Sequence, residues 1–97
     1  MSAFVVVHIN VKDPEKFKAY SSTAPATFKK YGGEFLIRGK VAGVLAGEHG
    51  HKMAAVIKFP DQAALQEWYN CEAYQALIPN RDEAADMVFI SCDEPPA

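Results

Sequence analysis

The sequence predicts an α+β fold whose elements follow the order strand, helix, strand, strand, helix, strand. Apolar and β-branched runs, which are typical of strands, occur at residues 4–11, 34–37, 53–59 and 87–92. Capping residues and helical apolar spacing lie between the first and second runs and between the third and fourth. A chain of 97 residues with 49% hydrophobic content has apolar mass for one core, so we expect a single domain over residues 1–97.

The first run is predicted to form a central strand of the sheet. Residues 4–11 read Phe-Val-Val-Val-His-Ile-Asn-Val and are apolar on both faces as far as His8. This pattern is typical of a strand that is covered on two sides.

A long helix is predicted to follow this strand. Asp13 provides an N-cap and Pro14 suits the first helical position. An apolar stripe with spacings of three and four continues to Gly32-Gly33, where we expect the helix to end. Pro25 lacks the backbone N–H that a helix interior needs, so we expect a kink or a break near residues 21–23.

The second and third strands are predicted to form a hairpin. Residues 34–37 form the second strand, and residues 44–47 can extend it beyond a bulge or turn. We place residues 48–51 at the hairpin tip and residues 53–59 in the third strand.

The remaining elements are a second helix, a short helix and a last strand. Pro60-Asp61 is expected to end the third strand and to cap the second helix. A short helix is predicted at residues 72–78, with Pro79 marking its end or a kink before an irregular stretch. Residues 87–92 form the last strand, and residues 93–97 are expected to be a loosely ordered tail.

This order of elements is the ferredoxin-like βαββαβ plan, a four-stranded antiparallel sheet with helices on one face. The first strand presents Val5 and Val7 on one face and Phe4 and Val6 on the other, and the third strand is also apolar on both faces. Monomers rarely expose so large an apolar surface. We therefore expect a homodimer that pairs through the uncovered face of the sheet.

Composition and motifs argue against several classes of function. The formal net charge is −2 and the ten Lys and Arg residues are scattered, so we expect no nucleic-acid partner. The sequence has no basic leader and no apolar segment of bilayer length, so we expect a cytoplasmic protein without a membrane partner. Cys71 and Cys92 lack metal-site spacing and are expected to be reduced. Phosphate-loop and nucleotide-binding motifs are missing, and we expect no cofactor.

Aromatic and arginine side chains near the ends of the predicted elements are the candidate ligand-binding residues. Arginine holds carboxylates through two parallel hydrogen bonds, and aromatic walls suit planar or apolar ligands. In the alternative interpretation the arginines pair with acidic side chains or helix carbonyls, and the aromatic rings pack in the core. The candidates are Tyr20, Arg38, Trp68, Tyr69, Tyr74 and Arg81.

His8 is the candidate catalytic residue, together with Arg38. We expect His8, Arg38 and Arg81 to bound a cavity that attracts an anionic metabolite. In a cofactor-free isomerase or oxygenase, His8 would act as the base and Arg38 would stabilise an enolate-like anion. This enzyme is the rival of our leading hypothesis, a small cytosolic homodimer that binds a small anionic or aromatic metabolite in a cavity between sheet and helices. A structural or interaction module is the third hypothesis.

His49 and His51 flank Gly50 and, with Glu48, resemble a metal cluster. Alternating positions on a tight turn need not converge on one ion, and a third ligand is missing nearby in the sequence. We therefore predict solvent-exposed loop histidines and no metal site.

Several short motifs are distributed over nearly the whole chain: Val11-x-Asp13-Pro14-Glu15, Tyr20, Tyr31-Gly32-Gly33, Arg38-Gly39, Leu45-x-Gly47, Phe59-Pro60, Trp68-Tyr69, Tyr74 and Arg81. Together they resemble the uncharacterised domain-of-unknown-function family numbered 1330, in the dimeric α/β-barrel superfamily. The resemblance implies a ferredoxin-like subunit that pairs through its sheet and keeps a cavity between sheet and helices. It implies no activity: the superfamily includes cofactor-free monooxygenases, lactone isomerases and haem-degrading enzymes, and none of their catalytic patterns is matched here.

The chain departs from the family's pattern in ways that affect the site. Ala46 stands where the family usually has an acidic residue, so an acid role at that position is lost. Residues 71–73 read Cys-Glu-Ala where the family tends to have Ser-Pro-Glu. We expect Asn70 to cap the short helix instead.

Overall fold

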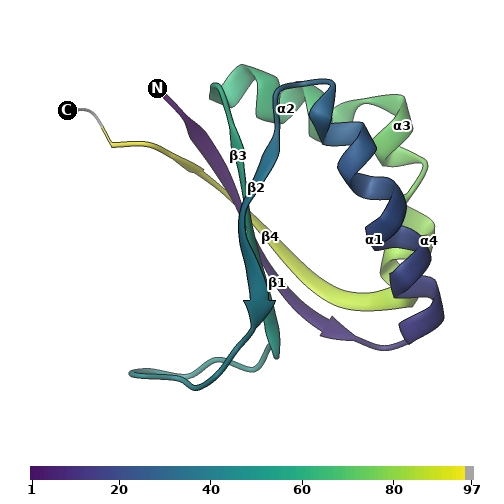
Figure 1. Ribbon diagram of the computed structural model, residues 1–97, viewed down its shortest axis with the longest axis vertical. Helices are drawn as coiled ribbons and strands as arrows, with labels where there is room; N and C mark the ends of the chain where they lie inside the picture. The colour runs from purple at the N-terminus through teal and green to yellow at the C-terminus, as the bar shows by residue number, and fades with distance from the viewer. Residues whose placement is uncertain (96–97) are drawn as a thin grey trace.

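The fold is a four-stranded antiparallel sheet with every helix of the described residues on one of its faces (Figure 1). The computed structural model describes residues 1–95. The predicted α+β, ferredoxin-like class is confirmed. The elements are β1 (Ala3–Val11), α1 (Pro14–Lys29), β2 (Glu34–Lys40), β3 (Met53–Phe59), α2 (Gln62–Asn70), α3 (Glu72–Gln75), α4 (Ile78–Ala84) and β4 (Ala85–Asp93).

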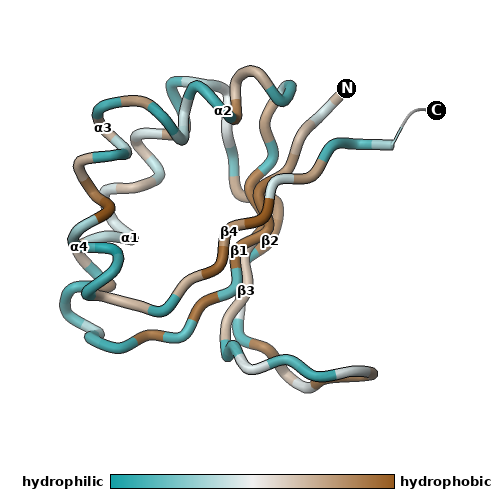
Figure 2. The backbone as a smooth tube through the Cα atoms, turned by 180° about the vertical axis from the view of Figure 1, so that it is seen from behind, coloured by the Kyte–Doolittle hydropathy of each residue, from teal (hydrophilic) through white to brown (hydrophobic). Residues whose placement is uncertain are grey.

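The strand order is β2-β3-β1-β4, which makes β1 a central strand as predicted. Val7 of β1 lies opposite Ala55 of β3 and opposite Phe89 of β4. Because side chains alternate along a strand, Val5, Val7 and Ile9 all face the helices, and all three are buried. Figure 2 shows the hydrophobic stretches of the strands, in brown, gathered at the middle of the sheet.

Helix α1 runs without interruption from Pro14 to Lys29, so of the kink or break predicted near residues 21–23 the break is wrong. Asp13 caps the helix as expected, and its Oδ1 accepts hydrogen bonds from the N–H groups of the first turn. Pro25 lies inside the helix and removes one backbone hydrogen bond. Burial of Tyr20 and Phe28 against the sheet offsets that loss, because packing of an apolar face supplies most of a helix's stability in a protein.

The connection between β2 and β3 differs most from the prediction. Residues 44–47 form no strand, and β2 ends at Lys40. The Val41 N–H donates to the Lys52 carbonyl over 2.8 Å and closes the base of a loop over residues 41–52. This loop projects from the sheet on the side away from the helices (Figure 1).

A β-bulge between Phe35 and Ile37 was also not predicted. The bulge inserts one extra residue, so the face to which each later side chain points is reversed. Phe35 and Arg38 therefore lie on the same face of the sheet, opposite Ile57 and Ala55 respectively.

Pro79 begins a helix rather than ending one. The short helix predicted at residues 72–78 is two helices, α3 and α4, and Pro79 lies in the first turn of α4. A first-turn proline is favourable because the N–H that it lacks has no partner there in any case. The cap of α3 was also wrongly predicted: Cys71 Sγ accepts from the Tyr74 N–H at 3.4 Å, whereas the Asn70 side chain donates to a carbonyl of α2.

The last strand is longer than predicted and includes Asp93, the first residue of the expected loosely ordered tail. Strand β4 continues to Asp93, and the Glu94 N–H donates to the Ser2 carbonyl over 2.9 Å. The expectation for Pro96 and Ala97 lies outside the described residues.

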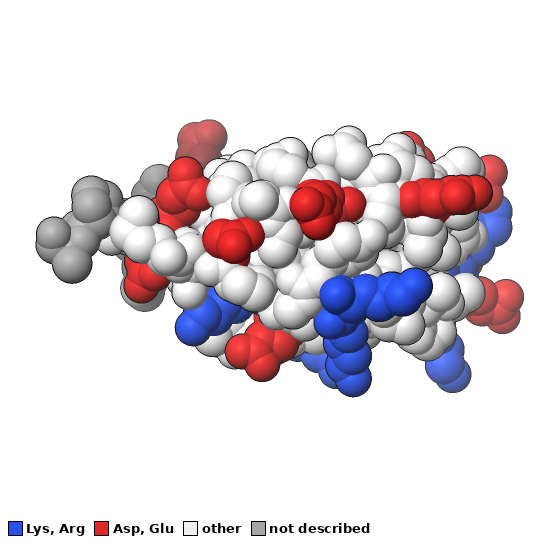
Figure 3. Space-filling view, turned by 90° about the horizontal axis from the view of Figure 1, so that it is seen from above, with Lys and Arg blue, Asp and Glu red and all other residues white. Residues whose placement is uncertain are grey.

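Acidic and basic side chains are interspersed on the surface displayed in Figure 3, without one extended basic patch. Within residues 1–95, no helix has the length and apolar character needed to cross a membrane.

Candidate functional site

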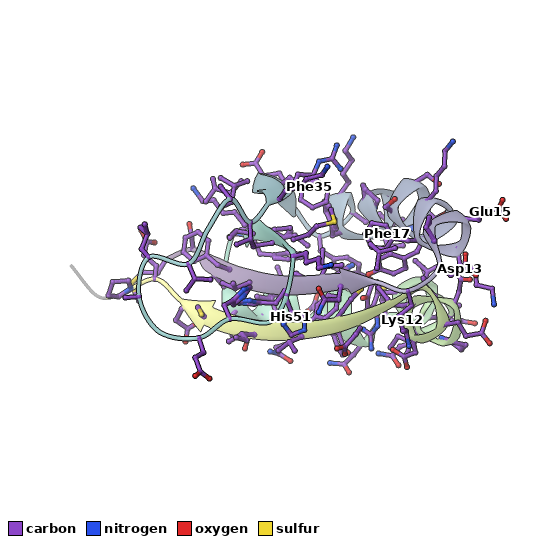
Figure 4. The ribbon with its side chains drawn as sticks, turned by 90° about the horizontal axis from the view of Figure 1, so that it is seen from below. Lys12, Asp13, Glu15, Phe17, Phe35 and His51 are labelled. Carbon is purple, nitrogen blue, oxygen red and sulfur yellow. The ribbon has the colours of Figure 1, made fainter. Side chains whose placement is uncertain are left out.

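A cavity of about 340 Å³ lies between the sheet and α1. This volume falls at the lower end of the range for small-molecule sites. Strands β1, β3 and β4 form its floor, α1 contributes Phe17 and Tyr20, and α2 contributes Trp68. Phe35 of β2 and Phe17 lie on the same side of β1 (Figure 4). The lining is largely apolar, so the cavity suits a hydrophobic or aromatic group.

Arg38 brings a positive charge to the rim of this cavity. Its side chain lines the cavity and is exposed to solvent. The guanidinium carbon lies 4.8 Å from the centroid of the Phe35 ring, which is cation–π geometry. Among residues 1–95, no carboxylate forms an ion pair with Arg38. The charge is therefore available to an anionic ligand.

A buried polar network adjoins the cavity at Tyr20. The Tyr20 and Tyr74 hydroxyls are 2.8 Å apart, and Arg81 Nη1 donates to the Tyr74 hydroxyl at 3.1 Å. The same nitrogen donates to the Tyr69 hydroxyl at 3.2 Å. Burial raises the pKa of both Tyr20 and Tyr74, so the two phenols stay neutral at physiological pH.

The predicted ligand-binding residues fall into two groups. Tyr20, Arg38 and Trp68 line the cavity, whereas Tyr69, Tyr74 and Arg81 belong to the network behind it. Arg81 Nε also pairs with Asp82 Oδ1 at 3.3 Å, which is the alternative that the sequence left open for the arginines. Trp68 is 1% exposed and belongs to the core, where its Nε1–H donates to Thr27 Oγ1.

The predicted cavity bounded by His8, Arg38 and Arg81 does not form within the subunit. His8 follows the buried Val7 and therefore points to the face of the sheet without helices. Arg38 lies opposite Ala55 on the helix side. The β-bulge in β2 sets this orientation of Arg38, and the sequence offered no signal for a bulge at that point.

His8 lies beside the two histidines of the loop instead. The ring centroids of His8 are 4.6 Å from His49 and 5.9 Å from His51. His8 Nδ1 and His49 Nε2 are in hydrogen-bonding contact. Burial, followed by the proximity of the other two histidines, lowers the pKa of His8. Residues 48–51 therefore do not form the hairpin tip that we predicted, because His49 and Gly50 contact side chains of β1. The expectation of solvent-exposed loop histidines is met only in part, since His49 and His51 are half-buried.

Residues 2–94 of the chain match the family described as "Domain of unknown function (DUF1330)". No curated protein matches the chain.

Three solved structures illustrate the structural similarity. RPA0582, a protein of unknown function from Rhodopseudomonas palustris, has a TM-score of 0.80 and 17% identity, covering 99% of this chain and 84% of that one. A dimeric ferredoxin-like protein of unknown function from Jannaschia sp. CCS1 has a TM-score of 0.76 and 10% identity, covering 97% and 100%. A mutant of SnoaB, a cofactor-independent oxygenase from Streptomyces nogalater, has a TM-score of 0.70 and 10% identity, covering 99% and 95%. At these identities the similarity establishes the fold alone.

Proposed function

Because this chain belongs to the DUF1330 family, whose description assigns no activity, we propose its function from the cavity. The protein binds a small anionic molecule with an aromatic or otherwise apolar body between the sheet and α1. One observation carries the proposal: Arg38, without an ion-pair partner in residues 1–95, lies at the rim of an apolar cavity.

The two parts of such a ligand would meet matching surroundings. The apolar body is removed from water against Phe17, Phe35 and Trp68, each of which lines the cavity. A carboxylate at the rim accepts two hydrogen bonds from Arg38, and the Phe35 ring holds the guanidinium in place. A ligand without an anionic group would keep the apolar contacts in the cavity and lose the hydrogen bonds to Arg38.

Binding of naphthoate, found by thermal shift and quantified by calorimetry, tests this proposal. We expect Arg38→Gln to weaken naphthoate binding by about 10- to 100-fold, the range for hydrogen bonds to a charged group. Lys40→Gln removes an exposed positive charge from the same strand outside the cavity lining and is the matched control, with affinity unchanged within about twofold.

Uncharged naphthylmethanol distinguishes the role of Arg38 from a change in cavity shape. We expect naphthylmethanol to bind more weakly than naphthoate to the wild type, and to bind with the same affinity to the wild type and to Arg38→Gln. Equal naphthoate affinity in these two proteins would remove Arg38 from the site, and no stabilisation by any carboxylated aromatic compound would reject the proposal.

The enzymatic alternative has less support than binding. It required His8 as a base and Arg38 as an anion stabiliser on one substrate, and these side chains lie on opposite faces of the sheet. We therefore propose binding without assigning a reaction.

We also propose that two copies of the chain pair through the face of the sheet that carries no helices. On this face Ile37, Val88 and Ile90 are 61%, 42% and 45% exposed, although all three are large and apolar. The structural neighbour from Jannaschia is described as dimeric, which supports pairing of this chain as well. We retain the cytoplasmic location as a proposal, with which reduced Cys71 and Cys92 are consistent.

A further inference from the structure

We propose that His8, His49 and His51 together bind one divalent transition-metal ion, such as zinc, on the face of the sheet opposite the cavity. The chain has three histidines in all, and these are the three. One ring nitrogen from each lies within 4.8 Å of the others, although His8 and His49 are 41 residues apart.

The fold positions the loop histidines through Asn10. Asn10 is two residues after His8 and therefore points to the same face of β1. Its Nδ2 donates to the Gly50 carbonyl at 2.9 Å, and its Oδ1 accepts from the Lys52 N–H at 2.9 Å. These two bonds hold the backbone on both sides of His51 against the strand. Figure 4 shows His51 beside β1 and β4.

The cluster contains a polar atom that the protein leaves without a partner. His51 Nε2 is buried and has no hydrogen bond among residues 1–95. The nearest acidic atom, Asp86 Oδ2, is 3.8 Å away, which is beyond hydrogen-bonding distance. A buried nitrogen without a partner is unfavourable, and coordination to a metal ion would satisfy it.

The donor set indicates the class of metal. Imidazole nitrogen suits zinc, copper and nickel, whereas magnesium and calcium prefer oxygen ligands. Three nitrogens leave a fourth tetrahedral position for water or for the Asp86 carboxylate. In a zinc site the ligand nitrogens lie about 2.0–2.1 Å from the ion. Around a tetrahedral ion such nitrogens are about 3.3–3.4 Å apart. A separation of up to 4.8 Å therefore has to contract by more than about 1 Å, through rotation of the imidazole rings and movement of the loop that carries His49.

Zinc titration of the full chain, without an affinity tag and after treatment with a chelator, tests the site. We expect one zinc ion per chain by calorimetry and a visible cobalt spectrum typical of tetrahedral nitrogen coordination. His49→Ala and His51→Ala should each weaken zinc binding by at least about 100-fold, more than the loss of an outer-shell contact.

Two control variants remove other potential metal ligands and should leave zinc binding unchanged. Glu48→Gln removes the acidic neighbour of His49 in the same loop, and Cys92→Ser removes an exposed thiol. Both should bind zinc as wild type does. Because His8 is in a central strand and His8→Ala can affect folding, the loop variant His49→Ala is the decisive one.

Several results would overturn the proposal. These are no zinc binding by the folded wild type, unchanged binding by His49→Ala, equal binding of magnesium and zinc, or one zinc ion per two chains. None of them bears on the cavity of Arg38, which lies on the other face.

Discussion

Tyr74 is the residue on which the buried polar network depends. Its side chain is fully buried, and its hydroxyl bonds both Tyr20 and Arg81. Tyr20→Phe leaves the Tyr74 hydroxyl bonded to Arg81, so we expect a loss of about 1 kcal/mol in the free energy of unfolding. Tyr74→Phe leaves the buried Tyr20 hydroxyl without a partner, and we expect a loss of about 2–3 kcal/mol.

Urea denaturation of both variants measures this difference, and Tyr20→Phe is the control for Tyr74→Phe because each loses one hydroxyl without opening a cavity. Equal losses would contradict the central role of Tyr74.

The sequence indicated that Tyr20, Tyr74 and Arg81 could share a site. It could not show that Tyr74 joins the other two, because Tyr20 and Tyr74 are 54 residues apart and the contact depends on how α1 packs beside α3.

At the level of elements, Gly33 allows β2 to start close to the core. A Cβ atom added there would lie 2.8 Å from Phe59 Cε1 and 3.0 Å from Phe28 Cβ. Phe59 is completely buried and Phe28 nearly so, and neither ring can move away. We expect Gly33→Ala to lower the free energy of unfolding by about 1–3 kcal/mol, measured by urea denaturation.

Gly39→Ala, within β2, is the matched control, because apart from its two chain neighbours no residue among 1–95 has a heavy atom within 4 Å of the added Cβ. Its effect should stay within about 0.5 kcal/mol. A Gly33→Ala protein as stable as Gly39→Ala would show that the turn can shift without cost.

Local chemistry explains which elements could be predicted. Asp13 and Asp61 act as helix caps in the structure, since a cap depends on residues two or three positions away. Pro79 was ambiguous, because a proline can follow one helix or begin the next. The bulge before Arg38 and the return of His49 to His8 depend on pairing with distant strands and side chains. These tertiary contacts separate the predicted site, with His8 facing Arg38, from the observed one.

At the level of the whole molecule, helices cover one face of the sheet, and no helix of residues 1–95 lies on the other (Figure 1). Val6 and Ile90 lie opposite each other at the centre of the uncovered face. Monomers rarely expose a large contiguous apolar surface, and self-association would remove these side chains from water. The same face carries the histidine cluster, so pairing and metal binding would take place on one side of the sheet.

Ile90→Lys tests pairing at the scale of the whole molecule. Ile90 is 45% exposed in the single chain, so lysine can reach water there and the subunit should still fold. In a dimer the same charge would be buried against a partner, which costs several kcal/mol when no opposite charge is present. We expect the wild type to sediment as a dimer at micromolar concentration and Ile90→Lys as a monomer. Ser91→Lys, the next residue on the helix side of the strand, should remain dimeric. A monomeric wild type, or an Ile90→Lys protein that is still dimeric, would show that this face does not mediate pairing.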